Sequence, residues 1–176
     1  HLPSGIQLDQ GENGYGLFSH YRVFTANRRY GGGAWDWPGE ARMRQDGSVE
    51  VRWPEATNRP FALRAVYRWA AADTLDLETV VEPRQDLPGF ESFLASYFAN
   101  RFTNALMWVR APDGKPSFRE CVKTLGDWQM APRDEAAVRW IDDGRWRIEP
   151  NPVNWTLQPR LAEPIGVRRD PASGLP

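Results

Sequence analysis

Apolar and polar side chains alternate along several short segments of the chain. The clearest segment is 61–69, where every second residue is apolar: Phe61, Leu63, Ala65, Tyr67 and Trp69. Arg64 and Arg68 fall on the opposite side. A period of two predicts a half-buried strand. Segment 75–81 repeats this alternation after a turn at 72–74, so the two segments are expected to pair as an antiparallel hairpin.

A second hairpin is predicted just upstream, because Asp46-Gly47 separates the segments 41–44 and 49–53. Further strands, bounded by Gly, Pro or Asn, are expected at 6–9, 16–25, 90–98, 105–110, 119–123, 155–158 and 165–168. Strand starts about ten residues apart are typical of a sandwich or barrel. The pattern therefore predicts an all-β protein, a twisted antiparallel β-sandwich.

One short helix is predicted near residues 133–141. Pro132 suits a first turn, Asp134 and Glu135 favour the positive end of a helix, and Gly144 follows the stop. With 176 residues, the chain is expected to form a single domain over 1–176. Residues 165–176 look like a strand entering a turn without its returning strand, which indicates that the domain is incomplete at its C-terminal end.

The charge balance limits the classes of partner. The 22 basic and 23 acidic residues nearly cancel, which argues against non-specific nucleic-acid binding. No apolar run approaches the roughly 18 residues of a membrane span, so a soluble chain is expected, although its compartment stays open. Cys121 is the only cysteine, and His1 and His20 are the only histidines. No metal site and no cofactor are expected from so few ligands.

The chain contains nine tryptophans, which is unusually many. Rings of this size either fill a core or stack on a flat ligand. Because sheets favour aromatic residues, most of the nine are expected in the core, and two or three remain for a binding site.

A first candidate site lies in segment 16–25. As a strand, this segment points Phe18, His20, Arg22 and Phe24 to one side. An imidazole titrates near neutrality, and a guanidinium beside aromatic walls suits a polyhydroxylated or anionic ligand. The alternative is an ordinary solvated sheet face.

A second candidate site lies in segment 30–40, which contains three consecutive glycines followed by Trp35, Asp36 and Trp37. If the segment is extended, both indoles lie on the same side, beside Asp36 and Glu40. Indole stacks on the C–H face of a sugar ring while carboxylates bind its hydroxyls, so this pattern indicates carbohydrate. The alternative is a loop whose tryptophans pack back onto the core. No P-loop lysine follows the glycines, so a nucleotide site has no support.

Four carboxylates could supply an acid and a base, although no spacing marks a pair: Glu78, Glu82, Asp86 and Glu91. A Cys121 nucleophile would need His20 as its base. Ser19 and His20 point to opposite faces of a strand and cannot pair directly.

The run 16–22, the strand 75–79 and the stretch 90–98 together resemble the first part of a galactose mutarotase-like domain, over about residues 5–125. This resemblance implies a β-supersandwich, the fold shared by aldose epimerases and by sheet domains of several polysaccharide-active enzymes. In the epimerases a histidine acid and a carboxylate base act on the ring oxygen and the anomeric hydroxyl. The resemblance therefore implies His20 as the acid, leaves the base unassigned, and we name Arg22 and Glu91 as the further candidate catalytic residues.

Three functional hypotheses follow. The first is a sugar-related protein that acts by general acid and base chemistry through His20, Arg22 and Glu91. The second is a non-catalytic carbohydrate-binding module that uses Trp35, Trp37, Asp36 and Phe18. The third is a structural β-domain of a larger protein, in which packing accounts for every tryptophan. The expected partner is a carbohydrate, with neither nucleic acid nor membrane, and the oligomeric state stays open.

Overall fold

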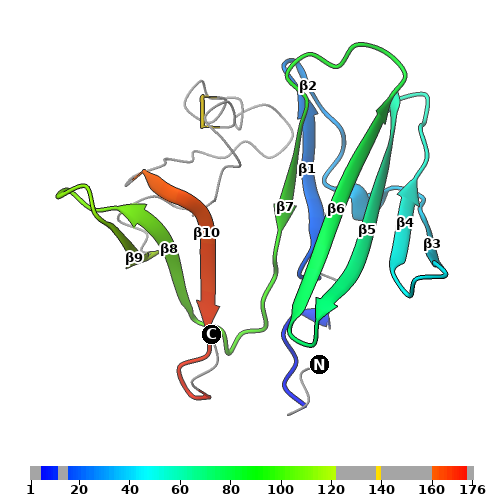
Figure 1. Ribbon diagram of the computed structural model, residues 1–176. Coiled ribbons are helices and arrows are strands. Elements are labelled where there is room, and N and C mark those ends of the chain that lie inside the picture. Colours follow the sequence, from blue (N-terminus) through cyan, green and yellow to red (C-terminus); the bar gives the residue numbers. More distant parts are fainter. Residues whose placement is uncertain (1–4, 12–15, 122–137, 140–159, 174–176) are drawn as a thin grey trace. The chain divides into compact units, whose positions relative to one another are not determined.

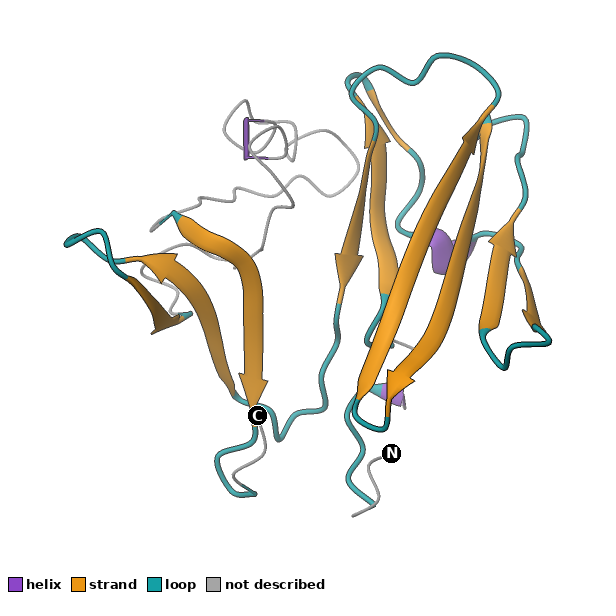
Figure 2. Ribbon diagram, in the orientation of Figure 1, coloured by secondary structure: helices purple, strands orange, loops and turns teal. Residues whose placement is uncertain are grey.

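The computed structural model describes residues 5–11, 16–121, 138–139 and 160–173. The chain divides into two compact units. One unit is His20–Leu94, and the other combines His1–Ser19 with Ala95–Pro176. Strands account for nearly all of the regular structure in the described residues (Figure 2). The protein is thus all-β and sandwich-like, as the alternation predicts.

The unit His20–Leu94 is built from two antiparallel sheets (Figure 1). The larger sheet has the order β3-β4-β5-β6. Its strands are β3 (Glu40–Met43), β4 (Val49–Trp53), β5 (Phe61–Ala71) and β6 (Thr74–Pro83). The smaller sheet has the order β2-β1-β7, from strands β1 (Ser19–Thr25), β2 (Arg28–Arg29) and β7 (Glu91–Ala95).

The turn between β3 and β4 forms where Asp46-Gly47 predicts it. Gly47 has a φ of +79°, a conformation that residues with a side chain rarely adopt. The carboxylate of Asp46 accepts hydrogen bonds from the backbone N–H of Ser48 at 3.0 Å and from its hydroxyl at 2.6 Å. This local network fixes the register, in which Arg42 lies opposite Glu50.

The core of this unit is an aromatic cluster around Phe61, which is fully buried. Its ring meets those of Tyr30, Phe90 and Trp37 edge-on, with centroids 5.0, 5.3 and 5.9 Å away. Edge-to-face packing brings the positive ring edge onto a negative ring face. Because Tyr30 follows β2 while Phe61 begins β5, the cluster joins the two sheets.

Burial falls along β5. Phe61, Leu63 and Ala65 are completely buried, as the alternation predicts. Trp69 shares their side of the strand but is 69% exposed. The last residues of β5 therefore extend beyond the packed part of the sandwich.

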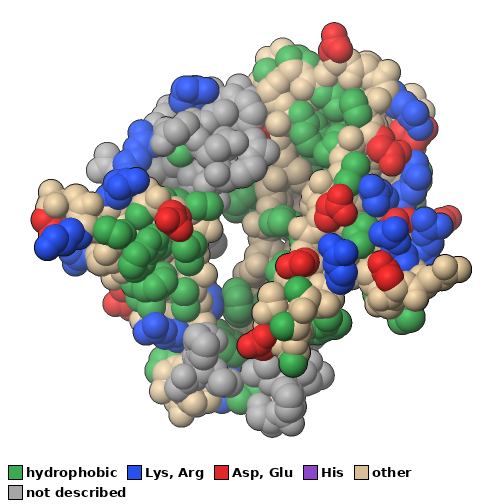
Figure 3. Space-filling view, viewed as in Figure 1, with side chains coloured by type: hydrophobic (Ala, Val, Ile, Leu, Met, Phe, Trp, Pro, Cys, Tyr) green, Lys and Arg blue, Asp and Glu red, His purple; other side chains and the backbone are tan. Residues whose placement is uncertain are grey.

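The opposite side of the β3–β6 sheet carries most of its charges. Figure 3 shows basic and acidic side chains interspersed over these strands. Arg52 and Glu82 pair across it at 2.9 Å. Val66 nevertheless is only 5% exposed, between Glu50 and Glu78 on the neighbouring strands. Long charged side chains thus cover apolar surface on this side.

The other unit contains a three-stranded sheet with the order β10-β8-β9. Its strands are β8 (Asn104–Arg110), β9 (Pro116–Glu120) and β10 (Leu161–Arg169). Trp108 and Phe118 pack across β8 and β9 with ring centroids 4.7 Å apart. Asp170, directly after β10, is buried and forms an ion pair with Arg101, with 2.6 Å between Oδ2 and Nη2.

Most of the expected strands are present, with shifted ends. Residues 6–9 are not a strand, since only Asp9 forms an isolated bridge, to Phe98. The strand expected at 119–123 begins earlier and is β9, Pro116–Glu120. The two-residue strand β2 was not predicted, because it is too short to show an alternation. Of the helix expected at 133–141, only Val138 and Arg139 are described, and both are helical; segment 155–158 lies outside the described residues. No helix in the described part of the chain has the length and apolarity needed to span a membrane.

Candidate functional site

His20, the proposed acid, lies on β1 and is only 2% exposed. Its Nε2 is hydrogen-bonded to the hydroxyl of Thr79 on β6 at 2.9 Å. Its ring packs edge-on against Trp53 on β4, with centroids 5.4 Å apart. Thr79 and Trp53 both belong to the larger sheet, so His20 links the two sheets of the unit.

Burial lowers the pKa of His20 to about 4, from 6.5. The Nδ1 atom is buried and has no hydrogen-bond partner among the described residues. Protonation would place a charge, and a donor without an acceptor, in this interior. The imidazole is therefore neutral at pH 7 and is poorly suited to give a proton to a substrate.

The other residues proposed on this strand side are also covered. Arg22 and Phe24 are each 3% exposed, and Phe18, just before β1, is half-buried. Glu91 lies half-buried on β7, the neighbour of β1 in the smaller sheet. No carboxylate contributes to the pKa shift of His20. The structure thus places His20, Arg22 and Glu91 in one sheet without pairing the histidine with a carboxylate.

The segment with three glycines is a turn rather than an extended stretch. Residues Ala34–Asp36 form the short 3-10 helix η2, so the two indoles do not share a side in the way an extended backbone would arrange them. Trp35 is 40% exposed, whereas Trp37 is half-buried. Asp36 is exposed between them.

Trp37 is occupied by contacts within the protein. Its ring meets Phe61 of the core, and the guanidinium carbon of Arg59 lies 4.0 Å from its centroid. Arg59 is 4% exposed, donates a hydrogen bond to the carbonyl of Pro54, and has a pKa lowered by burial. A cation over an indole face is a favourable contact that also keeps a ligand from that face. Trp37 thus serves as the anchor of the turn, and Trp35 is the more exposed of the two indoles.

The backbone of this turn requires glycine at one of the three positions. Gly31 has a φ of +74°, in the left-handed region that residues with a side chain rarely adopt. A Cβ on Gly32 would meet only Oδ2 of the exposed Asp36 side chain, which could move away. The carbonyl of Gly32 accepts a hydrogen bond from Arg29 at 3.2 Å, which ties the turn to β2.

Trp53 connects the two candidate clusters, which the sequence pattern gives no reason to expect. A Cβ on Gly39 would lie 2.8 Å from the Trp53 ring, so the chain after Trp37 runs directly against this indole. The same ring contacts His20. The two clusters are therefore neighbours, one inside the sandwich and one on its surface.

The remaining candidates offer little chemistry. No cluster of three or more potential metal ligands occurs in the described ranges of the chain. The pKa of the Cys121 thiol is raised, chiefly by burial, so little reactive thiolate is present at pH 7.

The described residues thus define an all-β, sandwich-like protein with an exposed tryptophan and carboxylate on a surface turn. No protein-family model, no curated protein and no solved structure matches the chain. The function is therefore argued from the geometry of the turn and the strands beneath it.

Proposed function

We propose that the unit His20–Leu94 is a non-catalytic carbohydrate-binding domain. A sugar ring stacks on the indole of Trp35, and the carboxylate of Asp36 accepts hydrogen bonds from the sugar hydroxyls. The observation that supports this most is the position of both side chains, exposed and adjacent on η2.

The physical basis is a preorganised platform. An indole offers a large flat apolar surface with few rotatable bonds, so stacking costs little conformational entropy. Trp37 packs on Phe61 beneath Arg59, which holds the backbone of the turn before any ligand arrives. Binding energy is then not spent on ordering the loop.

Binding is favoured over turnover by the state of His20. An epimerase-type reaction, which the resemblance to galactose mutarotase-like domains implies, needs a histidine that donates a proton beside a carboxylate base. His20 is buried, and its pKa is about 4. The same resemblance supports carbohydrate as the ligand class, and we retain it in that sense only.

The test is isothermal titration calorimetry of the full chain against a panel of neutral oligosaccharides. We expect binding to at least one of them, a loss of more than ten-fold in affinity in Trp35→Ala, and a smaller loss in Asp36→Asn. Trp69→Ala is the matched control, because it removes another exposed tryptophan from the same unit. A flat response from the wild-type chain, or an equal loss in Trp69→Ala, would overturn the proposal; conversion of a sugar that is abolished in His20→Gln would show an enzyme instead.

A further inference from the structure

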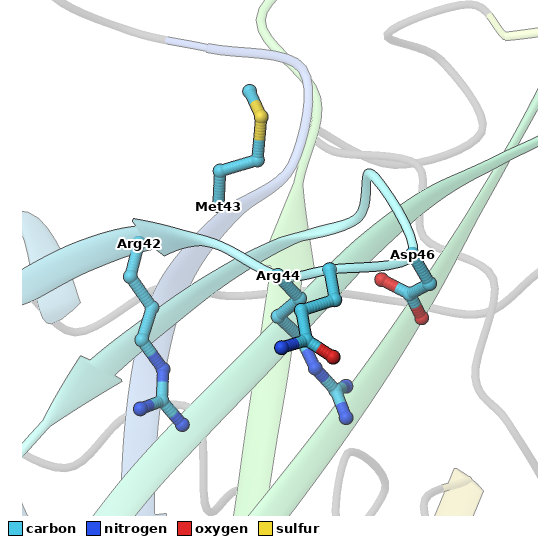
Figure 4. A pocket seen from close by; sticks show the side chains of 5 residues that line it. Arg42, Met43, Arg44 and Asp46 are labelled. Atoms are coloured by element: carbon cyan, nitrogen blue, oxygen red, sulfur yellow. The ribbon is translucent and has the colours of Figure 1, made fainter.

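Besides Arg52, which pairs with Glu82, four arginines lie on the charged side of the β3–β6 sheet. Arg42 on β3 and Arg44 just after it are two residues apart, so both point to the same side (Figure 4). Met43 points the other way. Arg64 and Arg68 on β5 complete the group, which we call the arginine cluster.

One carboxylate orders half of this cluster. The side chain of Glu50 is 7% exposed and lies 2.6 Å from Nη2 of Arg42 and 3.6 Å from Nη1 of Arg64. Burial alone would raise the pKa of Glu50, but the hydrogen bond and charge of Arg42, with the charge of Arg64, lower it overall. Nε of Arg42 also donates to Glu50, at 2.9 Å. One edge of the Arg42 guanidinium is thus fixed, while its side chain stays 73% exposed.

The second carboxylate nearby, that of Asp46, is already hydrogen-bonded within its own turn. Asp46 binds the backbone and hydroxyl of Ser48, which lower its pKa, and the charges of Arg44 and Arg68 contribute further. Within the described part of the chain, the Arg44 side chain makes no hydrogen bond and no ion pair. On β6, Asp76 lies directly opposite Arg68, and Glu78 lies opposite Val66. Of the four guanidiniums, that of Arg44 is therefore the one with no carboxylate opposite it or bonded to it among the described residues.

An open cavity of about 420 Å³ adjoins the two arginines of the hairpin. Its lining consists of Arg42, Met43, Arg44, Gln45 and Asp46 (Figure 4). Side chains two residues apart on one side of a strand are separated by roughly 7 Å, so a single oxyanion between them is within reach of both forks. Guanidinium forks bind carboxylate and sulfate through charge-assisted hydrogen bonds.

We propose that Arg42 and Arg44 form an anion-binding subsite for the carboxylate or sulfate group of an acidic polysaccharide. That the ligand is a polysaccharide rests on the proposed function. That it is acidic rests on the arginine cluster. Arg42 is oriented by Glu50, and Arg44 supplies donors that no described residue occupies.

The experiment measures binding of the full chain to polygalacturonate, to chondroitin sulfate and to the neutral oligosaccharides used above. We expect Arg44→Ala to weaken binding of at least one acidic polymer by about five- to ten-fold and to leave neutral ligands unchanged. Arg44→Gln should show the same loss. Arg119→Ala is the matched control, because it removes one exposed arginine from β9 in the other unit. Far-ultraviolet circular dichroism checks that each variant folds.

The outcomes separate the two proposals. Loss of neutral binding in Trp35→Ala together with loss of acidic binding in Arg44→Ala supports both. Acidic binding that depends on Arg44 without any neutral binding supports the subsite and overturns the neutral-sugar platform. Loss with polygalacturonate alone identifies a carboxylate, and loss with chondroitin sulfate alone identifies a sulfate. Equal losses in Arg44→Ala and Arg119→Ala, or no binding to either acidic polymer, would overturn the subsite.

Discussion

His20 and the segment that follows the Trp35 turn both contact Trp53, yet His20 and Trp35 differ in their access to solvent. His20 is 2% exposed and bonded to Thr79, whereas Trp35 is 40% exposed. A buried imidazole is kept neutral and holds two sheets together, while an exposed indole beside a carboxylate is available to a ligand. The comparison teaches that the most reactive residue type in a chain need not mark its binding site.

The division also runs through the turn itself. Trp37 lies against Phe61 and Arg59, while Trp35, two residues earlier, faces solvent. One indole packs into the core of the unit, and the other is 40% exposed. The substitutions below change either buried residues or exposed ones, and the stability of the fold is measured in each case.

The largest effect is expected from Phe61→Ala. Phe61 is fully buried and contacts the rings of Tyr30, Trp37 and Phe90. Its truncation should lower the free energy of unfolding by about 3–5 kcal/mol, because it leaves a cavity at the junction of the sheets. Urea denaturation measures this loss. A change below about 1 kcal/mol would show that the aromatic cluster does not hold the sandwich together.

The buried histidine should make stability depend on pH. His20 has a pKa of about 4 in the folded protein, compared with 6.5 for a histidine exposed to water. The unfolded chain therefore binds more protons than the folded chain between these values, so stability is full above pH 6.5 and falls as the pH approaches 4. The loss over this window is about 3 kcal/mol.

Urea denaturation of the wild-type chain and of His20→Gln, over the same pH range, measures this term. Other groups titrate in both proteins, so the difference between them isolates His20. Identical pH profiles would contradict a buried, neutral histidine.

The two tryptophans of the turn should separate stability from binding. Trp37→Ala should cost about 2–3 kcal/mol of unfolding free energy, because half-buried aromatic surface is lost. Trp35→Ala should cost less than about 0.5 kcal/mol, as expected of an exposed side chain. Thermal unfolding followed by circular dichroism measures both. Equal losses would mean that Trp35 belongs to the core as well.

A smaller loss of stability than in Trp37→Ala is expected from Arg59→Lys. The shorter reach of one ammonium should weaken the stacking on Trp37 and remove the hydrogen bond to the Pro54 carbonyl, at a cost of about 1 kcal/mol. Chemical denaturation measures the loss, and Arg84→Lys is the control, since Arg84 forms an exposed ion pair with Glu55. An Arg59→Lys variant as stable as the wild type would show that the contact of Arg59 with Trp37 does not stabilise the turn.

Local patterns predicted much of the fold. The Asp46-Gly47 turn and the alternation of 61–69 and 75–81 predicted β3 to β6, because register and turn chemistry act over neighbouring residues. The two residues of β2 are too few for any period. The exposure of Trp69 also escaped prediction, because alternation indicates which side of a strand a residue lies on but not where the covering sheet ends.

The site was less predictable, because its residues depend on distant partners. The neutral state of His20 is set by packing around Thr79, which is 59 positions away in the chain, and around Trp53. The roles of Trp35 and Trp37 diverge because the segment forms η2, where an extended segment would have placed both rings on one side. The residue types of the proposed sugar platform could be read from the sequence, but their exposure could not.

The most direct test of a glycan platform at η2 follows the tryptophan indole N–H resonances by nuclear magnetic resonance. The chain is labelled with ¹⁵N at the indole nitrogens, and single Trp→Phe variants assign the signals of Trp35, Trp37 and Trp53. Titration with the tightest ligand from the oligosaccharide panel should shift the Trp35 signal most and leave that of Trp53 nearly unchanged. A Trp35 signal that stays in place while the ligand binds would contradict the account.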